Sequence, residues 1–214
     1  MAITVDATST STAQSGFDTF SWSHTCASDA SLLIISVATR DGGGNYDVSG
    51  VTYNGVSCTK AIDVQSSGIN AEIWYLINPA SGAHDVTVTA GSTDYGAGGA
   101  VSLKGTKRST SVLNATNTRT AGTGDPTLSV TTTENGCYVI DCVYSDLNSN
   151  LTVGADQTQI FQVSLQSGSD RGCGSYKSAT TAGSVTMGWS GNNGNSQVVA
   201  AFSPSKGIKT IFIG

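Results

Sequence analysis

The sequence of 214 residues predicts an all-β protein, an antiparallel β-sandwich built from an internally duplicated strand unit. Three observations support this prediction. Apolar residues alternate with Thr and Ser over short runs, turn residues separate these runs, and no stretch shows helical periodicity. The stretch from Ala71 to Gly105 holds three such apolar runs, and a degraded copy of it returns from Gly172 to Ser203. With 26 glycines and only 12% charged residues, the composition also suits strands and tight turns.

The first part of the chain predicts strands in a regular order. Residues 3–7 alternate between apolar and polar types, which predicts a half-buried first strand, and residues 17–24 predict a second strand with aromatic side chains on one face. Residues 32–37 are apolar on both faces, which is typical of a central strand covered on both sides. Residues 51–55 end in Asn-Gly, the strongest short signal for a hairpin turn.

Three further strands are expected between residues 71 and 105. Glu72 to Ile77 and Gly99 to Leu103 are apolar runs, and Val86 to Thr89 alternates with period two. Asn78 to Gly82 contains both Pro and Gly and predicts the turn between the first two runs. The Gly-rich approach from Gly96 to Gly99 precedes no helix, so it predicts close backbone packing or a bulge, not a phosphate cradle.

The second half of the chain repeats the pattern of the first. Ser31–Ala38 matches Gly136–Val143 at an offset of 105 residues, and Gly99–Ser102 matches Val198–Ala201 at an offset of 99. Because a lone copy would leave an apolar face uncovered, we expect both copies to form one sandwich of roughly ten to twelve strands. Two small linked domains are the alternative. The expected organisation is a single domain over residues 1–204, with pseudo-repeats at about 17–105 and 127–204, an exposed connection at 106–126, and a C-terminal extension at 205–214.

Charge and hydropathy exclude several classes of partner. The net charge of −5 argues against a nucleic-acid partner, since phosphates are bound by clustered Lys and Arg. The one basic cluster, Lys104, Lys107 and Arg108, is expected to be a solvated loop. No apolar run approaches the roughly 20 residues that span a bilayer, and the N-terminus MAITVDATS does not resemble a secretory leader. We therefore expect neither nucleic acid nor membrane among the partners.

The five cysteines show no zinc-type spacing. Free cysteine is among the most buried residue types, so we expect small, reduced core residues and folding in a reducing compartment. One or two disulfides formed after release remain an alternative. The residues concerned are Cys26, Cys58, Cys137, Cys142 and Cys173.

The sequence carries no motif of a known catalytic chemistry. GxSxG, HExxH and Walker patterns are all absent, and His24 and His84 lie in no context that points to a Ser or Cys nucleophile. We therefore expect a protein that is not an enzyme and that needs no cofactor. A hydrolase is kept as a third alternative, because catalytic groups can converge from distant parts of a chain.

Two binding hypotheses rest on loop residues. Asp41, Asn45 and Asp47 have the spacing of oxygen ligands in a calcium loop, although a hairpin loop without metal is the favoured interpretation. Tyr46 and Tyr95 lie in Gly-rich stretches and are candidate exposed contacts for a sugar. By contrast, Trp22, Trp74 and Trp189 occupy alternating strand positions, where burial in the core is expected.

Several motifs together resemble a known family. They are VTYNG, EIWYLINPASGAHDVTVTAGS, GAGGAVSLKG, the segment from Gly154 to Gln159, GSVTMGWSG, and the run from Gln197 to Pro204. This set resembles a family of β-sandwich proteins found among phage virion proteins and as modules of bacterial surface proteins, and the similarity spans most of residues 17–204.

The resemblance implies a jelly-roll-like module used for assembly or adhesion on the outside of a particle or cell. We therefore expect a structural virion protein of a bacteriophage, a capsid decoration or cement protein or another repeated exterior component, assembled in the host cytoplasm. Its expected partners are the major capsid protein or copies of itself, in a homo-oligomer or a lattice. The alternative is a carbohydrate- or receptor-binding adhesion module of a phage tail or bacterial surface.

The C-terminal extension departs from the family pattern. Ile211, Phe212 and Ile213 form a β-branched and aromatic strip that would be an aggregation hazard if uncovered. We regard these three residues as a candidate assembly contact that adds a strand to the sheet of a neighbouring subunit. Pairing within its own chain is an equal alternative.

Overall fold

The computed structural model describes residues 2–41, 48–146, 149–165, 169–191 and 195–206. Within these residues it consists almost entirely of antiparallel β-strands. The first half contains β1 (Thr4–Thr10), β2 (Gln14–Cys26), β3 (Leu32–Arg40), β4 (Val48–Tyr53), β5 (Val56–Ser57), β6 (Thr59–Ser66), β7 (Ile69–Ile77) and β8 (Gly82–Lys104). After a short 3-10 helix (Thr110–Val112), the second half contains β9 (Leu113–Gly122), β10 (Thr127–Thr132), β11 (Cys137–Ser145), β12 (Thr152–Val153), β13 (Thr158–Leu165), β14 (Asp170–Ala179), β15 (Gly183–Ser190) and β16 (Asn195–Phe202).

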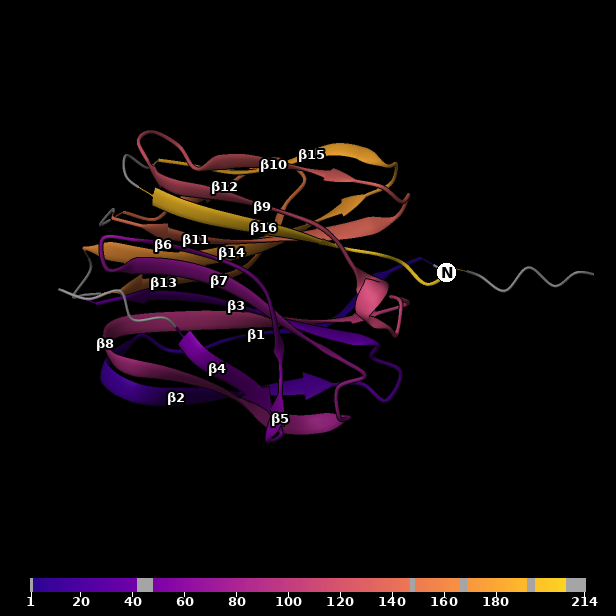
Figure 1. The fold of residues 1–214 in the computed structure, drawn as a ribbon, viewed down its shortest axis with the longest axis horizontal. Coiled ribbons are helices and arrows are strands. Elements are labelled where there is room, and N and C mark those ends of the chain that lie inside the picture. The colour runs from indigo at the N-terminus through magenta and orange to yellow at the C-terminus, as the bar shows by residue number, and fades with distance from the viewer. Residues whose placement is uncertain (1, 42–47, 147–148, 166–168, 192–194, 207–214) are drawn as a thin grey trace, which may run out of the picture.

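The strands form four stacked layers; in Figure 1 the first is lowest, the fourth is uppermost and the two inner layers lie between them. The first layer contains β2, the N-terminal part of β8, β4 and β5, and the second contains β1, the C-terminal part of β8, β3, β7 and β6. The third layer has the order β13-β14-β11-β16-β9, and the fourth has the order β10-β15-β12. The long strand β8 runs through both of the first two layers.

The strand order of the first half is repeated in the second. β3 lies between β7 and β8, as β11 lies between β14 and β16. β6 and β13 are the corresponding border strands, and they pair with β7 and β14. In the outer layers, β8 lies between β2 and β4 as β15 lies between β10 and β12. β15 and β16 together therefore correspond to the single strand β8. The predicted all-β sandwich class with an internally duplicated unit is confirmed.

Side-chain directions shift one part of the predicted alignment by one residue. The predicted offset places Ile35 on Ile140, but Ile35 faces the core between the first two layers and Ile140 faces the middle of the molecule. Ile34, which also faces the middle, is the true counterpart of Ile140. A slip of one residue reverses every side chain of a strand, so only the three-dimensional packing distinguishes the two alignments where both faces are apolar.

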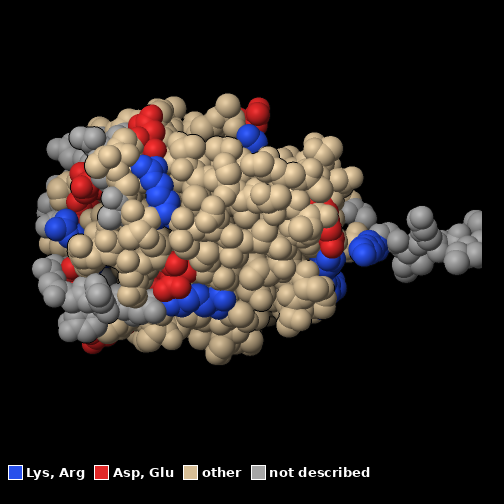
Figure 2. Space-filling model, turned by 45° about the horizontal axis from the view of Figure 1, so that its top comes forward, with Lys and Arg blue, Asp and Glu red and all other residues tan. Residues whose placement is uncertain are grey.

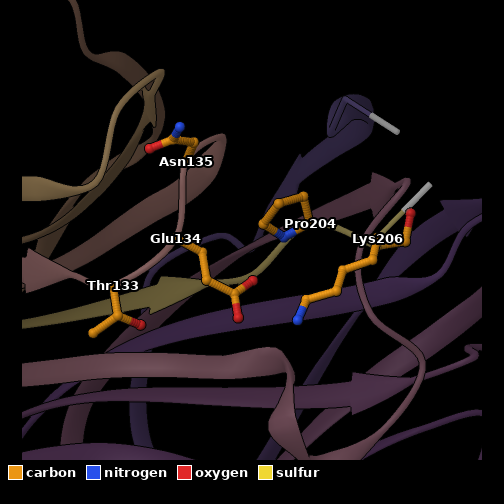
Figure 3. Close-up of a pocket in the computed structure, with 6 residues that line it drawn as sticks. Thr133, Glu134, Asn135, Pro204 and Lys206 are labelled. Atoms are coloured by element: carbon orange, nitrogen blue, oxygen red, sulfur yellow. The ribbon is translucent and has the colours of Figure 1, made fainter. Parts of the chain in front are cut away.

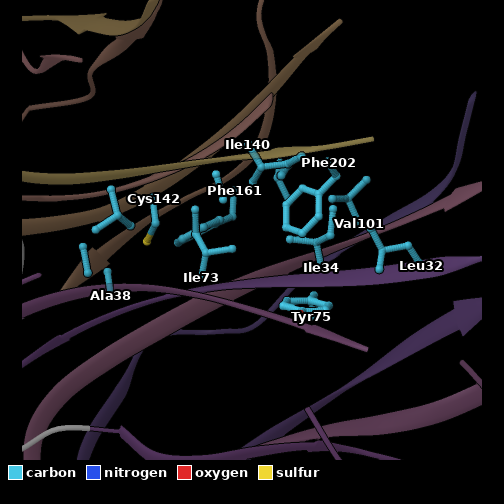
Figure 4. Close-up of a cluster of buried hydrophobic side chains, with 14 of the residues drawn as sticks. Leu32, Ile34, Ala38, Ile73, Tyr75, Val101, Ile140, Cys142, Phe161 and Phe202 are labelled. Carbon is cyan, nitrogen blue, oxygen red and sulfur yellow. The ribbon is translucent and has the colours of Figure 1, made fainter. Parts of the chain in front are cut away.

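The largest core lies between the second and third layers and joins the two halves. It contains Leu32 and Ile34 of β3, Ile140 of β11, and the rings of Phe161 and Phe202, as Figure 4 shows. A second core fills the space between the first two layers, and two smaller cores lie between the last two. β3 is thus apolar on both faces because a core covers each face, as the sequence predicts.

The Gly-rich segment of β8 allows close packing on both faces of the sheet. A Cβ atom on Gly98 would come within 2.9 Å of the Trp22 ring, and one on Gly99 would come within 2.6 Å of Phe161. The prediction of close backbone packing at this segment is confirmed. The Asn-Gly hairpin is also confirmed, since Asn54 and Gly55 connect β4 to β5 with φ of 50° and 75°.

The structure places one strand where the sequence predicts an exposed connection. The expected connection at 106–126 contains β9, which pairs with β16 along the border of the third layer. Its apolar residues Leu113 and Ala115 are only partly buried, so its alternation is too weak to recognise in the sequence. Within residues 1–204 the strands form a four-layer stack, in which each half forms a two-layer sandwich and the inner sheets meet at a shared core.

Candidate interaction surfaces

The outer face of the first layer is a sheet of hydroxyl groups. On β2, Phe20, Trp22 and His24 point inward, so the alternate residues point to solvent. Cross-strand pairing places Thr19 beside Thr89 and Ser21 beside Thr87. The outward-facing residues of this layer are Thr19, Ser21, Ser23 and Thr25 of β2, Asp85, Thr87 and Thr89 of β8, and Thr52 of β4.

The outer face of the fourth layer repeats this arrangement on the opposite side of the molecule. Ser129 of β10 lies beside Thr186 of β15, and their hydroxyl oxygens are 2.8 Å apart. Thr127 and Thr131 of β10 are exposed on the same face. Since Thr19, Ser21 and Ser23 of β2 correspond to Thr127, Ser129 and Thr131 of β10, the hydroxyl character is present in both copies.

Charged side chains are sparse on the side of the molecule that Figure 2 shows. A broad uncharged area separates the charged groups on this side. The basic cluster predicted to be a solvated loop lies at one end and has local partners. Lys104 pairs with Asp29 at 2.6 Å and with Asp6 at 3.4 Å, Lys107 pairs with Glu134 at 2.6 Å, and Arg108 donates to Asn78.

A polar hollow lies at the same end, beside the last described residues. Glu134 and Lys206 point towards one another across it, with Pro204 between them (Figure 3). The hydrogen bond from Lys107 lowers the pKa of Glu134. Ser205 N donates to Gly105 O at 2.7 Å, which fixes the chain to the connection between the halves just before the C-terminal extension.

The predicted contact residues have different outcomes. Ile211, Phe212 and Ile213 lie outside the described residues, as do Tyr46, Asn45 and Asp47. Tyr95 is described, and the prediction that it lies in an exposed loop is wrong. It is a half-buried residue of β8, paired with both Ser15 and Arg40, and it packs against the middle core. The reason is that the Gly-rich segment around it forms a strand.

The calcium hypothesis gains no site from the described residues. Asp41 is described, and its backbone N donates to Gly68 O at 2.7 Å. In the parts of the chain that the structure describes, no three His, Cys, Asp or Glu side chains converge as metal ligands. Those parts also include no helix with the length and hydrophobicity that a bilayer crossing requires.

Ser9 and His24 form a pair that the sequence did not reveal. Ser9 Oγ lies 2.8 Å from His24 Nδ1 and accepts a hydrogen bond from Trp22 Nε1 at 3.0 Å. Burial lowers the pKa of His24 to about 4, so the imidazole is neutral at pH 7 and is a weak general base. The pair links β1 to β2 across the first two layers, and this arrangement serves packing better than it serves acyl transfer.

Each half of the molecule also contains one fully buried carboxylate beside a tryptophan. In the first half, Glu72 accepts from Trp74 Nε1 at 2.7 Å and lies 3.3 Å from Lys60 Nζ. In the second half, Asp141 accepts from Trp189 Nε1 at 2.8 Å. Each carboxylate thus has the hydrogen-bond donors that a buried acid requires.

The predictions for cysteine and tryptophan are confirmed. All five cysteines are buried and free. Trp22, Trp74 and Trp189 are all core residues, so their ring faces are occupied by packing and offer no surface for sugar stacking. Val56 is the only large apolar side chain that is exposed among the described residues.

No model of a protein family, no curated protein and no solved structure matches this chain.

Proposed function

We propose that the chain is a structural protein that acts by protein–protein assembly, as a repeated exterior component of a phage particle such as a capsid decoration or cement protein. One observation carries the assembly part of this proposal. Two corresponding, nearly neutral, hydroxyl-rich sheet faces lie on opposite sides of a single four-layer body. The phage part rests on the sequence resemblance, and assembly in the host cytoplasm belongs to the same proposal.

Such faces suit repeated, individually weak contacts. A polar face binds through hydrogen bonds and shape complementarity at a modest buried area, and many copies on a symmetric lattice add their contributions. Two faces on opposite sides allow one chain to contact two neighbours, either the major capsid protein or further copies of itself. The three free thiols Cys137, Cys142 and Cys173 of the second half, like the two of the first, agree with folding in a reducing compartment.

The C-terminal extension is proposed as an additional contact. Its residues Ile211, Phe212 and Ile213 supply β-branched and aromatic side chains suited to strand addition, on a neighbouring subunit or on the chain's own sheet. Ser203 and Ser205 are held by backbone hydrogen bonds to Val112 and Gly105, so the extension starts from a fixed point.

The test is incorporation into particles. Gradient-purified particles analysed by mass spectrometry and electron cryomicroscopy are expected to contain the chain in many symmetry-related copies. Deletion of residues 205–214 is expected to lower incorporation while leaving the urea midpoint of the isolated chain unchanged. Absence of the chain from purified particles would refute the virion role, and a deletion that lowers stability alone would assign the extension to its own sheet.

A carbohydrate- or receptor-binding module is the second candidate, and one observation favours it. A polar hollow on the outer face of the first layer is lined by Thr52, Asn54, His84, Asp85 and Thr87. Side chains of these types bind the hydroxyl groups of neutral sugars. Binding on a glycan array that is lost in Asp85→Ala and retained in Ser184→Ala, at the corresponding position of β15, would establish this function in place of assembly.

A further inference from the structure

The strands that border the sheets differ in how well they are protected from pairing with another chain. An unprotected border strand presents free backbone N–H and C=O groups, and natural proteins block it with charges, prolines, bulges or short length. β5 and β12 have two residues each. Register shifts interrupt the pairing of β1, β6, β9 and β13, and three of these strands also carry charges, at Asp6, at Lys60 and at Arg119.

β2 lacks this protection over most of its length. It is the longest border strand, with 13 residues, and among the described strands it pairs only with β8. Its one register shift lies between Phe17 and Thr19, and from Thr19 to Cys26 the pairing with β8 is uninterrupted. This segment contains no Lys, Arg, Asp, Glu or Pro, and its one histidine, His24, points into the core.

The corresponding strand of the second half is less suited to such pairing. β10 has only 6 residues, and Pro126 directly precedes it. Proline has no N–H to donate to a neighbouring strand, so it ends the available edge. The two corresponding border strands therefore differ, and β2 of the first half has the long uninterrupted edge.

We propose that β2 pairs antiparallel with β2 of a second copy of this chain across a two-fold axis. This inference rests on the proposed assembly function and identifies one of its contacts. A second copy fits because the edge is self-complementary. With the axis beside Trp22, Ser21 lies opposite Ser23 of the second copy, and cross-strand pairs of Ser and Thr form without like-charge repulsion.

The pairing would join the outer layers of two molecules into one continuous sheet. The four strands β5, β4, β8 and β2 of one copy would continue into the same strands of the second in reverse order. The inward-facing residues Phe20 and Trp22 would then lie beneath the junction, next to their counterparts. The outer hydroxyl face would double in extent and stay free for other partners.

The test compares two matched double variants of the full chain. Ser21→Lys with Ser23→Lys places ammonium groups opposite one another across the proposed axis, at positions that are exposed in the monomer. Ser129→Lys with Thr131→Lys introduces the same charges at the corresponding positions of β10. Sedimentation equilibrium is expected to show a dimer whose dissociation constant rises at least roughly ten-fold in the β2 variant and is unchanged in the β10 variant.

Hydrogen exchange supplies a second measurement that does not depend on a variant. Amides of residues 19–26 are expected to exchange more slowly as the concentration of the wild-type chain rises through the dissociation constant, while those of residues 127–132 stay unchanged. A chain that is monomeric at every concentration, or a dimer that protects another strand, would overturn the proposal. Incorporation into particles is measured separately, so a monomer that still incorporates would refute this contact and leave the proposed function standing.

Discussion

Glu72 and Asp141 are fully buried carboxylates, one in each half of the molecule, and they obtain their hydrogen-bond donors in different ways. Glu72 lies on β7 and Asp141 on β11, which are not corresponding strands, yet each accepts a hydrogen bond from a tryptophan in the core of its own half. Glu72 also has a cationic partner, Lys60, whose side chain is 25% exposed. The four hydrogen bonds that Asp141 accepts come from neutral donors, namely Ser175 N, Ser175 Oγ, Trp189 Nε1 and Gln197 Nε2.

This difference shows that duplication preserved the fold but not the polar interior. The position of Asp141 corresponds to Ile35 in the first half, and that of Glu72 corresponds to Cys173 in the second. Each acid is therefore present in one copy only. A buried polar group is tolerated when all its hydrogen bonds are satisfied, and the two halves reached this condition with unrelated sets of partners.

The largest effect is expected from Asp141→Ala. The substitution removes the acceptor for four donors and leaves Trp189 Nε1 and Ser175 N buried without it, so the free energy of unfolding should fall by about 3–5 kcal/mol. Urea unfolding at pH 7 measures this loss in the free energy of unfolding. Ser175→Ala, which removes a single hydroxyl, is the control with an expected loss of about 1 kcal/mol. Equal losses in the two variants would contradict the larger role of the Asp141 carboxylate in this network.

The next largest effect is expected in the pH dependence of stability, which should differ between the wild type and Asp141→Asn. Burial raises the pKa of Asp141 from 3.8 to about 6, and the four donors only partly offset this effect. Because the folded pKa is above the unfolded one, the contribution to stability is present below pH 3.8 and is lost as the pH rises through 6. On acidification from pH 7 to pH 4, the wild type should therefore gain about 2–3 kcal/mol relative to Asp141→Asn.

The Asp141→Asn comparison removes the contributions of other groups that titrate in this range. His24, whose pKa is lowered to about 4 by burial, acts with the opposite sign, since its contribution is lost as the pH falls through 4. It is present in both proteins and cancels in the difference. Parallel pH profiles of wild type and Asp141→Asn would contradict a raised pKa at Asp141.

A smaller loss is expected from Glu72→Ala. The donors Trp74 Nε1 and Val48 N lose their acceptor, but Lys60 is partly exposed and can turn to solvent or towards Asp63, which is 3.7 Å away. We expect a decrease of about 2 kcal/mol in the free energy of unfolding, measured in urea beside Asp141→Ala. A loss greater than that of Asp141→Ala would reverse the proposed difference between the halves.

The smallest effect is expected from Lys60→Met, which makes the surroundings of Glu72 resemble those of Asp141. Met keeps the aliphatic packing over Trp74 and removes only the partly exposed charge, so the loss should be at most about 1 kcal/mol in thermal or urea unfolding. A loss of several kcal/mol would mean that neutral donors suffice for Asp141 but not for Glu72. Lys177→Met, at a partly exposed lysine of the second half, is the matched control.

The local properties of this protein follow from residues that are close in sequence. Alternation placed Trp22, Trp74 and Trp189 in the core, the Asn-Gly pair set the hairpin at residue 54, and the repeated pattern indicated duplication. These properties depend on residues close in sequence, because the period of a strand shows which side chains share a face. The hydroxyl-rich surface also follows from composition and alternation alone.

The tertiary structure decided which faces meet. The number of layers, the role of β9, the half-buried position of Tyr95 and the shift of one residue between β3 and β11 all depend on contacts between distant segments. Asp141 and Glu72 look like surface residues in the sequence, since an acid at an alternating position usually faces water. Only packing brings Trp189, Gln197 and Ser175 around Asp141, because donors for a buried charge must come from several strands at once.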